Sequence, residues 1–345
     1  MSKFKKYIIP TIFVLFTVSL ILFSKSNIIA VKSGLDLWIN NIVPSLFPFF
    51  IAVELINNTF LPMLIENIFQ KIMKPLFNVP GVGAYALFMG IISGYPVGAK
   101  IVTDLRNKNL CTKEEGERLL TFTNNSGPLF ILGTVGISLF RDTSIGLLLL
   151  STHLLSCFTV AFIFRFWKSH SRNEKVDILD NNSNLISVND LGNVLSTSIV
   201  NAIKSVVLIG GFVVFFSVVL SILDKMYFFS MFFNILKPPF NILNINPNFI
   251  IPLTSGIIEL TSGVNLVTAV PSANLGINVV FAAFLLGFGG ISILLQVWSI
   301  SSNSDISIKP YILGKFLQGL FASIYTFLII SNFSYFKYLL QFTVH

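Results

Sequence analysis

Apolar segments separated by short polar ones recur along the whole chain. The main apolar segments lie near residues 7–23, 82–103, 119–140, 143–164, 198–223, 247–270, 277–299 and 311–333. A helix needs about 20 predominantly apolar residues to span the hydrocarbon core of a bilayer. Of the 345 residues 54% are hydrophobic and 11% are charged, whereas soluble domains carry about 25% charged residues. The pattern therefore predicts an all-α polytopic membrane protein.

The first apolar segment follows three lysines, Lys3, Lys5 and Lys6. Positive residues concentrate on the cytoplasmic side of a membrane, so we expect a cytoplasmic N-terminus. The stretch SKSNIIA after this segment is a poor signal-peptide cleavage site, so residues 1–29 are expected to remain as an N-terminal transmembrane helix. The net charge of +8 is spread over segment ends, which favours membrane anchoring over nucleic-acid binding.

Residues 30–57 allow two interpretations. An amphipathic stretch comes first, and Pro44 and Pro48 are expected to bend the chain before a short apolar run. That run is either a full crossing or half of a re-entrant hairpin. Basic residues at 165–172 indicate a cytoplasmic central linker, which agrees with a cytoplasmic N-terminus only if an even number of crossings separates them.

The polar stretch 165–196 divides two halves that resemble each other, 30–164 and 197–345. Three landmarks recur in the same order, 162 or 163 residues apart: IMKPLFN with ILKPPFN, Ser93-Gly94 with Ser255-Gly256, and Gly127 with Gly290. Such collinear matches predict an internal duplication. Duplicated halves with interrupted hydrophobic segments in matching places are typical of secondary transporters.

Four apolar segments carry helix-breaking residues: SGYPVGAK at 93–100, TNNSGP at 123–128, TSGIIELTSG at 254–263 and GFGG at 287–290. Backbone polar groups inside a membrane must be satisfied, so interruptions persist only where protein, water or a ligand supplies partners. The breaks therefore predict an interior cavity near the interface of the two repeats. Free helix N-termini beside Ser, Thr and Asn side chains favour a small, polar, anionic solute.

The candidate substrate-binding residues are those at the four breaks. They are Ser93, Gly94, Tyr95, Pro96, Gly98, Lys100, Asn124, Asn125, Ser126, Gly127, Ser255, Gly256, Thr261, Ser262, Gly289, Gly290 and Ser292. Some of them have structural alternatives: Gly94 and Gly98 fit a helix-packing motif, Asn124 and Asn125 fit helix caps, and Lys100 fits a headgroup contact.

A carboxylate near mid-membrane is costly, which makes Glu259 the most informative single residue. We expect it to bind a coupling proton or cation, to balance charge, or to pair with Lys100 across the repeat. Glu54 is a weaker second candidate. The charged connector at 104–118 is expected to form a solvated helix without chemistry.

Catalytic and metal-binding patterns are missing from the sequence. Cys111 and Cys157 make no metal or redox pattern, and no HExxH, GxSxG or GxxxxGK[ST] motif occurs. We therefore expect no metal, no cofactor, no ATPase activity and no enzymatic function.

The stretches SGYPVGAKIVTDL, LLTFTNNSGPLFILGTVG and TSGIIELTSG resemble the sporulation integral membrane protein family YlbJ, also called SpoVV. That family belongs to the group with the nucleoside-recognition Gate domain. The resemblance implies inverted repeats with re-entrant hairpins and broken helices, similar to concentrative nucleoside transporters. It also implies export of dipicolinic acid from the mother cell across the outer forespore membrane of a spore-forming bacterium.

Two other functions remain open at this point. One keeps the fold and changes the solute to a nucleoside or another small polar molecule. The other is a non-transporting membrane scaffold in spore assembly, which predicts no solvent-accessible cavity at the breaks.

Overall fold

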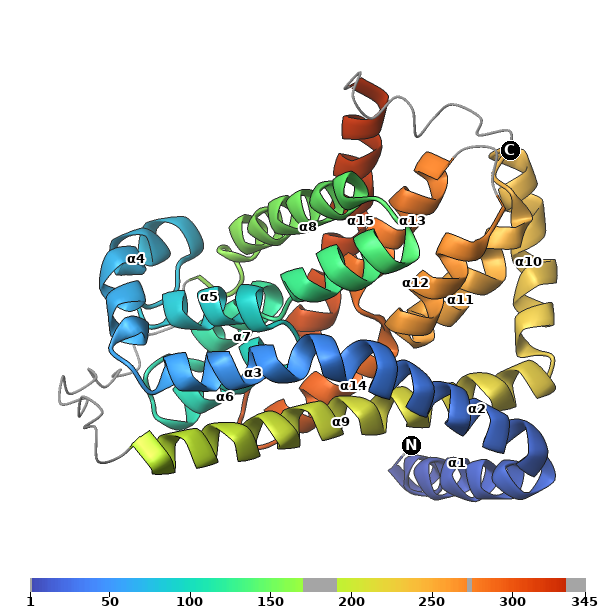
Figure 1. Ribbon diagram of the computed structural model, residues 1–345, viewed down its shortest axis with the longest axis horizontal. Coiled ribbons are helices and arrows are strands. Elements are labelled where there is room, and N and C mark those ends of the chain that lie inside the picture. The colour runs from blue at the N-terminus through green and yellow to red at the C-terminus, as the bar shows by residue number, and fades with distance from the viewer. Residues whose placement is uncertain (1, 170–190, 272–274, 333–345) are drawn as a thin grey trace.

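The computed structural model describes residues 2–169, 191–271 and 275–332, and all regular elements in these ranges are helices (Figure 1). The first half contains α1 (Ser2–Leu22), α2 (Ser24–Leu37), η1 (Trp38–Ile42), α3 (Val43–Asn57), α4 (Leu61–Phe77), α5 (Gly83–Ser93), α6 (Val97–Asn107), α7 (Lys113–Thr123), η2 (Phe130–Leu139) and α8 (Thr143–Phe164). The second half contains α9 (Leu191–Lys225), α10 (Phe228–Ile242), η4 (Pro247–Phe249), α11 (Ile250–Ile258), α12 (Leu260–Ala269), α13 (Leu275–Phe288), α14 (Gly290–Ser301) and α15 (Lys309–Asn332). Most of the predicted linker lies outside the described residues, and its last residues already belong to α9.

Several helical segments of the described chain are long and apolar enough to cross a membrane. They are Thr143–Phe164, Leu191–Lys225, Leu275–Ser301 and Lys309–Asn332, and the bent pair Pro10–Leu22 and Ser24–Asn40 passes the same test with an angle of 97° at its break. These spans confirm the expected all-α polytopic membrane protein.

The segment from Ser24 to Asn57 stays helical throughout, so Pro44 and Pro48 do not interrupt the helix, and the bend expected at these prolines stays a prediction. Pro44 lies in the first turn of α3, directly after the π-helical η1. Pro44 lacks the N–H that would continue the helical hydrogen-bond ladder, and the π-helical turn of η1 lies directly before it. Both α2 and α3 pack along the long helix α9, as Figure 1 shows.

Two pairs of short helices fold back on themselves and meet at glycines. In the first pair, α5 and α6, a Cβ on Gly90 would lie 3.3 Å from the Cα of Gly98. In the second pair, α11 and α12, a Cβ on Gly263 would overlap the Cα of Gly256. Glycine allows this close approach because it carries no side chain. The tip of the first hairpin is residues 94–96, and the tip of the second is Glu259.

Two longer helical runs are interrupted instead of reversed. Residues 124–128 are non-helical between α7 and η2, and Gly289 separates α13 from α14. Gly289 and Gly290 have φ values of +84° and +78°, a left-handed backbone region that glycine enters without steric cost. All four predicted interruptions are therefore present.

The order of elements recurs in the two halves. An amphipathic helix containing the Lys-Pro pair (α4, α10) precedes a hairpin, then a broken run (α7–η2, α13–α14), then a spanning helix (α8, α15). The landmark pairing of Ser93-Gly94 with Ser255-Gly256 is not the structural one. Ser93-Gly94 lies at a hairpin tip, whereas Ser255-Gly256 lies inside α11, before the tip. That the halves are related by inversion stays a prediction.

The charged connector is not wholly solvated, contrary to expectation. Glu117 is buried and accepts hydrogen bonds from Trp167 Nε1 at 2.8 Å and Lys168 Nζ at 3.0 Å. Arg118 is buried as well and donates to the carbonyl of Trp167 at 2.7 Å. These contacts attach α7 to the residues that follow α8. The charged side chains of Glu117 and Arg118 therefore have a structural role.

Candidate solute-binding cavity

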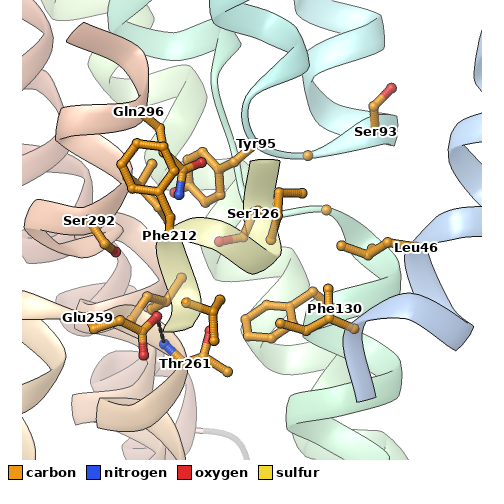
Figure 2. A pocket seen from close by; sticks show the side chains of 17 residues that line it. Leu46, Ser93, Tyr95, Ser126, Phe130, Phe212, Glu259, Thr261, Ser292 and Gln296 are labelled. Carbon is orange, nitrogen blue, oxygen red and sulfur yellow. Dashed lines mark hydrogen bonds between the residues drawn. The ribbon is translucent and has the colours of Figure 1, made fainter. Parts of the chain in front are cut away.

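A partly open cavity lies where the two hairpin tips and the two interrupted runs come together. The volume in which the centre of a water molecule fits is about 80 Å³. By the same measure, one water molecule needs about 10–15 Å³. Its polar and glycine lining consists of Ser93, Gly94, Tyr95, Ser126, Gly127, Glu259, Thr261, Ser292 and Gln296. Figure 2 shows Glu259, Ser292 and Gln296 on one side, opposite Leu46 and Phe130. Three of the four breaks thus contribute lining residues, and the fourth contributes through Ser292 and Gln296 of the helix that follows it.

The tip of the first hairpin packs directly on the first interrupted run. Gly94 has a φ of +76°, and a Cβ on it would lie 2.7 Å from the amide nitrogen of Gly127. In the second half, a Cβ on Gly290 would lie 3.0 Å from the carbonyl oxygen of Gly256 and 3.2 Å from the nitrogen of Leu260. Each hairpin therefore touches the interrupted run of its own half through glycine backbone.

Two side chains of the first half form hydrogen bonds with one backbone carbonyl of the second half beside the cavity. The hydroxyl groups of Tyr95 and Ser126 both donate to the carbonyl oxygen of Leu286, each over 3.3 Å. Leu286 belongs to the last turn of α13, where carbonyls lack partners within the helix. The first half therefore satisfies the end of a helix from the second.

Glu259 occupies the N-terminus of α12 with its own side chain. Its two carboxylate oxygens accept from the backbone N–H groups of Thr261 at 2.9 Å and Ser262 at 2.7 Å. A carboxylate is favourable at a helix N-terminus, where free N–H groups and the helix dipole are positive. The anion site expected at this helix end is therefore filled by the protein itself. Among the described residues Glu259 makes no ion pair with Lys100, which is exposed on α6.

Four polar side chains of the lining make no hydrogen bond to any described residue. They are Ser93, Thr261, Ser292 and Gln296. The hydroxyl of Ser93 is also buried. Buried polar groups normally have partners, so these side chains are suited to a polar solute or to water. The N-terminus of α14 adjoins them and has no side-chain cap.

The remaining lining is apolar and comes largely from outside the predicted breaks. It consists of Ile42, Leu46, Phe130, Ile209, Phe212, Val213, Leu260 and Ile293. Ile209, Phe212 and Val213 lie on α9. The sequence of this helix predicts only an apolar span. No polar signal marks these positions, so only the packing of α9 over the breaks reveals them. Apolar and polar side chains therefore both line the cavity, and Phe212 lies beside Gln296 and Ser292 (Figure 2).

Several predicted site residues lie near the cavity without lining it. They are Pro96, Gly98, Lys100, Asn124, Asn125, Ser255, Gly256, Ser262, Gly289 and Gly290. The glycines allow close backbone contacts, and Ser262 bonds Glu259 through its N–H. Glu54 also lies elsewhere, with its carboxylate accepting from Asn201 Nδ2 at 3.3 Å.

Asn124 and Asn125 face away from the cavity, toward α15. Asn124 Nδ2 donates to the hydroxyl of Tyr311 at 2.8 Å, and Gln318 Nε2 donates to Asn125 Oδ1 at 2.9 Å. Lys315 Nζ donates to the carbonyl of Asn124 at 3.0 Å. One face of α15 therefore holds the interrupted run that presents Ser126 to the cavity.

Comparison with known proteins relates the chain to one curated relative and one domain family. The chain is 32% identical over 342 residues to the sporulation integral membrane protein YlbJ of Bacillus subtilis (strain 168), covering 95% of the chain and 84% of that protein. Residues 39–168 match the Gate family, described as nucleoside recognition. No solved structure matches the chain.

Proposed function

Because the chain belongs to the family of the sporulation integral membrane protein YlbJ, we propose that it moves dipicolinic acid from the mother cell across the outer forespore membrane by alternating access. The family and the apolar spans make it an integral membrane protein of a spore-forming bacterium. The transported compound and the direction are the proposal. No catalytic step is part of it.

One observation carries this proposal: unpartnered polar side chains from both halves face a single cavity that apolar side chains also line. Ser93 comes from the first half, and Thr261, Ser292 and Gln296 come from the second. A planar pyridine ring with two carboxylates needs hydrogen-bond donors at its edge and apolar contacts on its faces. The polar residues supply the donors, and Phe130 and Phe212 supply the aromatic contacts.

Glu259 is the charged side chain of the lining, and its carboxylate would repel a dianion. Binding both in one cavity requires a proton or a cation to reduce the repulsion. We therefore include a coupling proton or cation at Glu259 in the proposal. Such a carboxylate inside a membrane is a common carrier of coupling ions.

The experiment combines binding with a spore phenotype. Purified protein in detergent should be stabilised by pyridine-2,6-dicarboxylate in a thermal-shift assay, and spores of a deletion strain should lose dipicolinic acid. The variant Phe212→Trp, which enlarges a lining side chain, should fail to restore it. Phe215→Trp should restore it, because Phe215 is exposed on α9 and does not line the cavity. Normal dipicolinic acid in the deletion strain would contradict the proposal.

A nucleoside is the second candidate solute, because the matching Gate family is described as nucleoside recognition. A nucleoside would use the same neutral donors and would not conflict with the charge of Glu259. Thermal-shift titration of uridine beside dipicolinate separates the two candidates. Stabilisation by uridine alone would replace the first proposal with the second.

A further inference from the structure

A buried lysine lies directly behind the cavity, at a position that no sequence motif marks. Lys315 of α15 is 0% exposed. Its Nζ donates to the carbonyl of Asn124 at 3.0 Å and to Gln318 Oε1 at 2.7 Å, and it lies 5.3 Å from the centre of the Tyr95 ring. An ammonium group has three N–H donors. Two oxygens and the face of an aromatic ring therefore match the donors of the charged form.

The positive charge of Lys315 has no negative partner in the described part of the chain. The carboxylates of Glu117 and Asp305 pair with Lys168 and Arg106, and that of Glu259 caps α12. The other side chains around Lys315 are neutral amides, a thiol and an imidazole: Gln318, Asn125, Cys157 and His153. A buried charge without a partner is costly, so its place beside a cavity indicates a use for it.

Tyr95 connects this charge to the cavity. The Tyr95 side chain lines the cavity, while Lys315 lies over the ring and does not line it. Across packed protein, where the dielectric constant is lower than in water, a charge acts over a longer range. Lys315 can therefore raise the electrostatic potential of the cavity without contacting the solute. The positive charge of Lys315 also offsets part of the negative potential that Glu259 produces in the cavity.

We propose that Lys315 determines the specificity of the cavity for anions, by holding a positive charge behind Tyr95. The inference rests on the proposed function, because it assigns the charge selectivity of the same site. A solute with carboxylates is favoured over a neutral solute of the same shape. Lys100, the lysine among the candidate substrate-binding residues, is exposed and outside the lining.

The test compares two probes of one shape, pyridine-2,6-dicarboxylate and the neutral pyridine-2,6-dicarboxamide, on the full-length protein in detergent. Calorimetry on the wild type should show tighter binding of the dicarboxylate. Lys315→Met should weaken dicarboxylate binding at least tenfold and change diamide binding less than threefold. Lys315→Gln, which keeps a donor for the Asn124 carbonyl, tests the same point if the methionine variant does not fold. Lys315→Arg should keep the preference.

Lys100→Met is the matched control, since it removes the same charge from an exposed position, and it should leave both affinities unchanged. If Lys315→Met and Lys315→Gln still prefer the dicarboxylate, the inference about Lys315 is overturned and the dipicolinate proposal is not. Equal weakening of both probes would assign Lys315 a purely structural role and would overturn it too. A wild type without any preference for the dicarboxylate would overturn both this inference and the dipicolinate proposal.

Discussion

Gly94 and Gly127 face each other at the cavity with no room for a side chain between them. A Cβ on Gly94 would lie 2.7 Å from the nitrogen and 2.9 Å from the Cα of Gly127. Gly94 also has a φ of +76°, which L-residues rarely adopt. The contact brings the tip of the first hairpin onto the first interrupted run, so the shape of the cavity depends on the absence of a side chain at Gly94.

Gly94→Ala should therefore destabilise the protein and abolish solute binding. The backbone of Gly94, with φ +76° and ψ −167°, lies in a region essentially restricted to glycine and alone costs an alanine about 1–3 kcal/mol. The overlap with Gly127 adds to that cost, because both partners are backbone atoms that cannot rotate away. Gly133→Ala is the control, since a Cβ on Gly133 meets nothing within 4 Å. Melting temperatures and dipicolinate titrations of both variants check the prediction, and equal behaviour of the two would contradict it.

Glu259→Gln should separate binding from ion coupling. Glutamine keeps one oxygen for the N–H groups of Thr261 or Ser262 and loses the other acceptor, at a cost to stability of about 1 kcal/mol. Without the negative charge, dicarboxylate should bind more tightly at neutral pH. Solute exchange between equal concentrations should persist in proteoliposomes, whereas uphill uptake driven by a proton or cation gradient should disappear.

Glu54→Gln provides the control for that variant, since Glu54 contacts Asn201 and does not line the cavity. It should retain both exchange and uphill uptake. Gradient-driven uptake that is unchanged in Glu259→Gln would remove Glu259 from ion coupling while leaving the cavity as a binding site.

The fold was predictable from the sequence where a local rule decides it. Apolar length locates the spans, and glycine or proline inside an apolar segment locates all four breaks. The continuity of the helix through Pro44 was not predictable, because a proline in a first turn resembles a helix-breaking proline until the helix start is known. The burial of Glu117 was not predictable either, because it depends on a contact with a distant part of the chain. Its neighbours Glu114 and Glu115 are polar, but its own partner Lys168 lies 51 residues away.

The cavity residues divide in the same way. Ser93, Tyr95, Ser126, Glu259, Thr261 and Ser292 lie at breaks and could be proposed from sequence, and the structure places them around one cavity. Phe212 and Lys315 lie in unbroken apolar helices, where nothing local distinguishes them. Lys315 resembles a residue that reaches the membrane surface from near the start of α15, and only the packing of α15 against α7 and α13 shows that it is buried.

Asn125→Ala should act through the position of the interrupted run, because Asn125 faces α15 and not the cavity. The substitution removes the acceptor of Gln318 Nε2, which costs about 1–3 kcal/mol for a buried group, while the carbonyl of Phe122 keeps the thiol of Cys157 as a donor at 3.0 Å. Gln318→Ala should cost more, because it also removes the acceptor of Lys315 Nζ, and the double variant should lose less than the sum. Unfolding in denaturant measures the coupling. Additive losses would show that the hydrogen bond between these side chains contributes nothing.

The pair formed by Arg106 and Asp305 predicts a pH dependence outside the membrane spans. Arg106 Nε and Nη2 donate to the two carboxylate oxygens of Asp305 at 2.9 and 3.0 Å, joining the end of α6 to the loop before α15. This hydrogen bonding lowers the pKa of Asp305 below its ordinary value of 3.8. A lowered carboxylate pKa stabilises the folded state above that ordinary value, and the contribution disappears as the pH falls through the folded-state pKa.

Asp305→Asn should accordingly lower the melting temperature slightly and by the same amount from pH 7 to pH 5. The difference from wild type should shrink below about pH 4, where the wild-type carboxyl group becomes protonated and is therefore neutral like the asparagine amide. The side chain of Asp305 is 49% exposed, so the coupling in a double-variant cycle with Arg106→Ala should not exceed about 1 kcal/mol. Lys309→Ala, a charge removal at an exposed position near the same loop, should show no such pH dependence. A difference between Asp305→Asn and wild type that stays constant down to pH 3 would mean that the ion pair does not stabilise the fold.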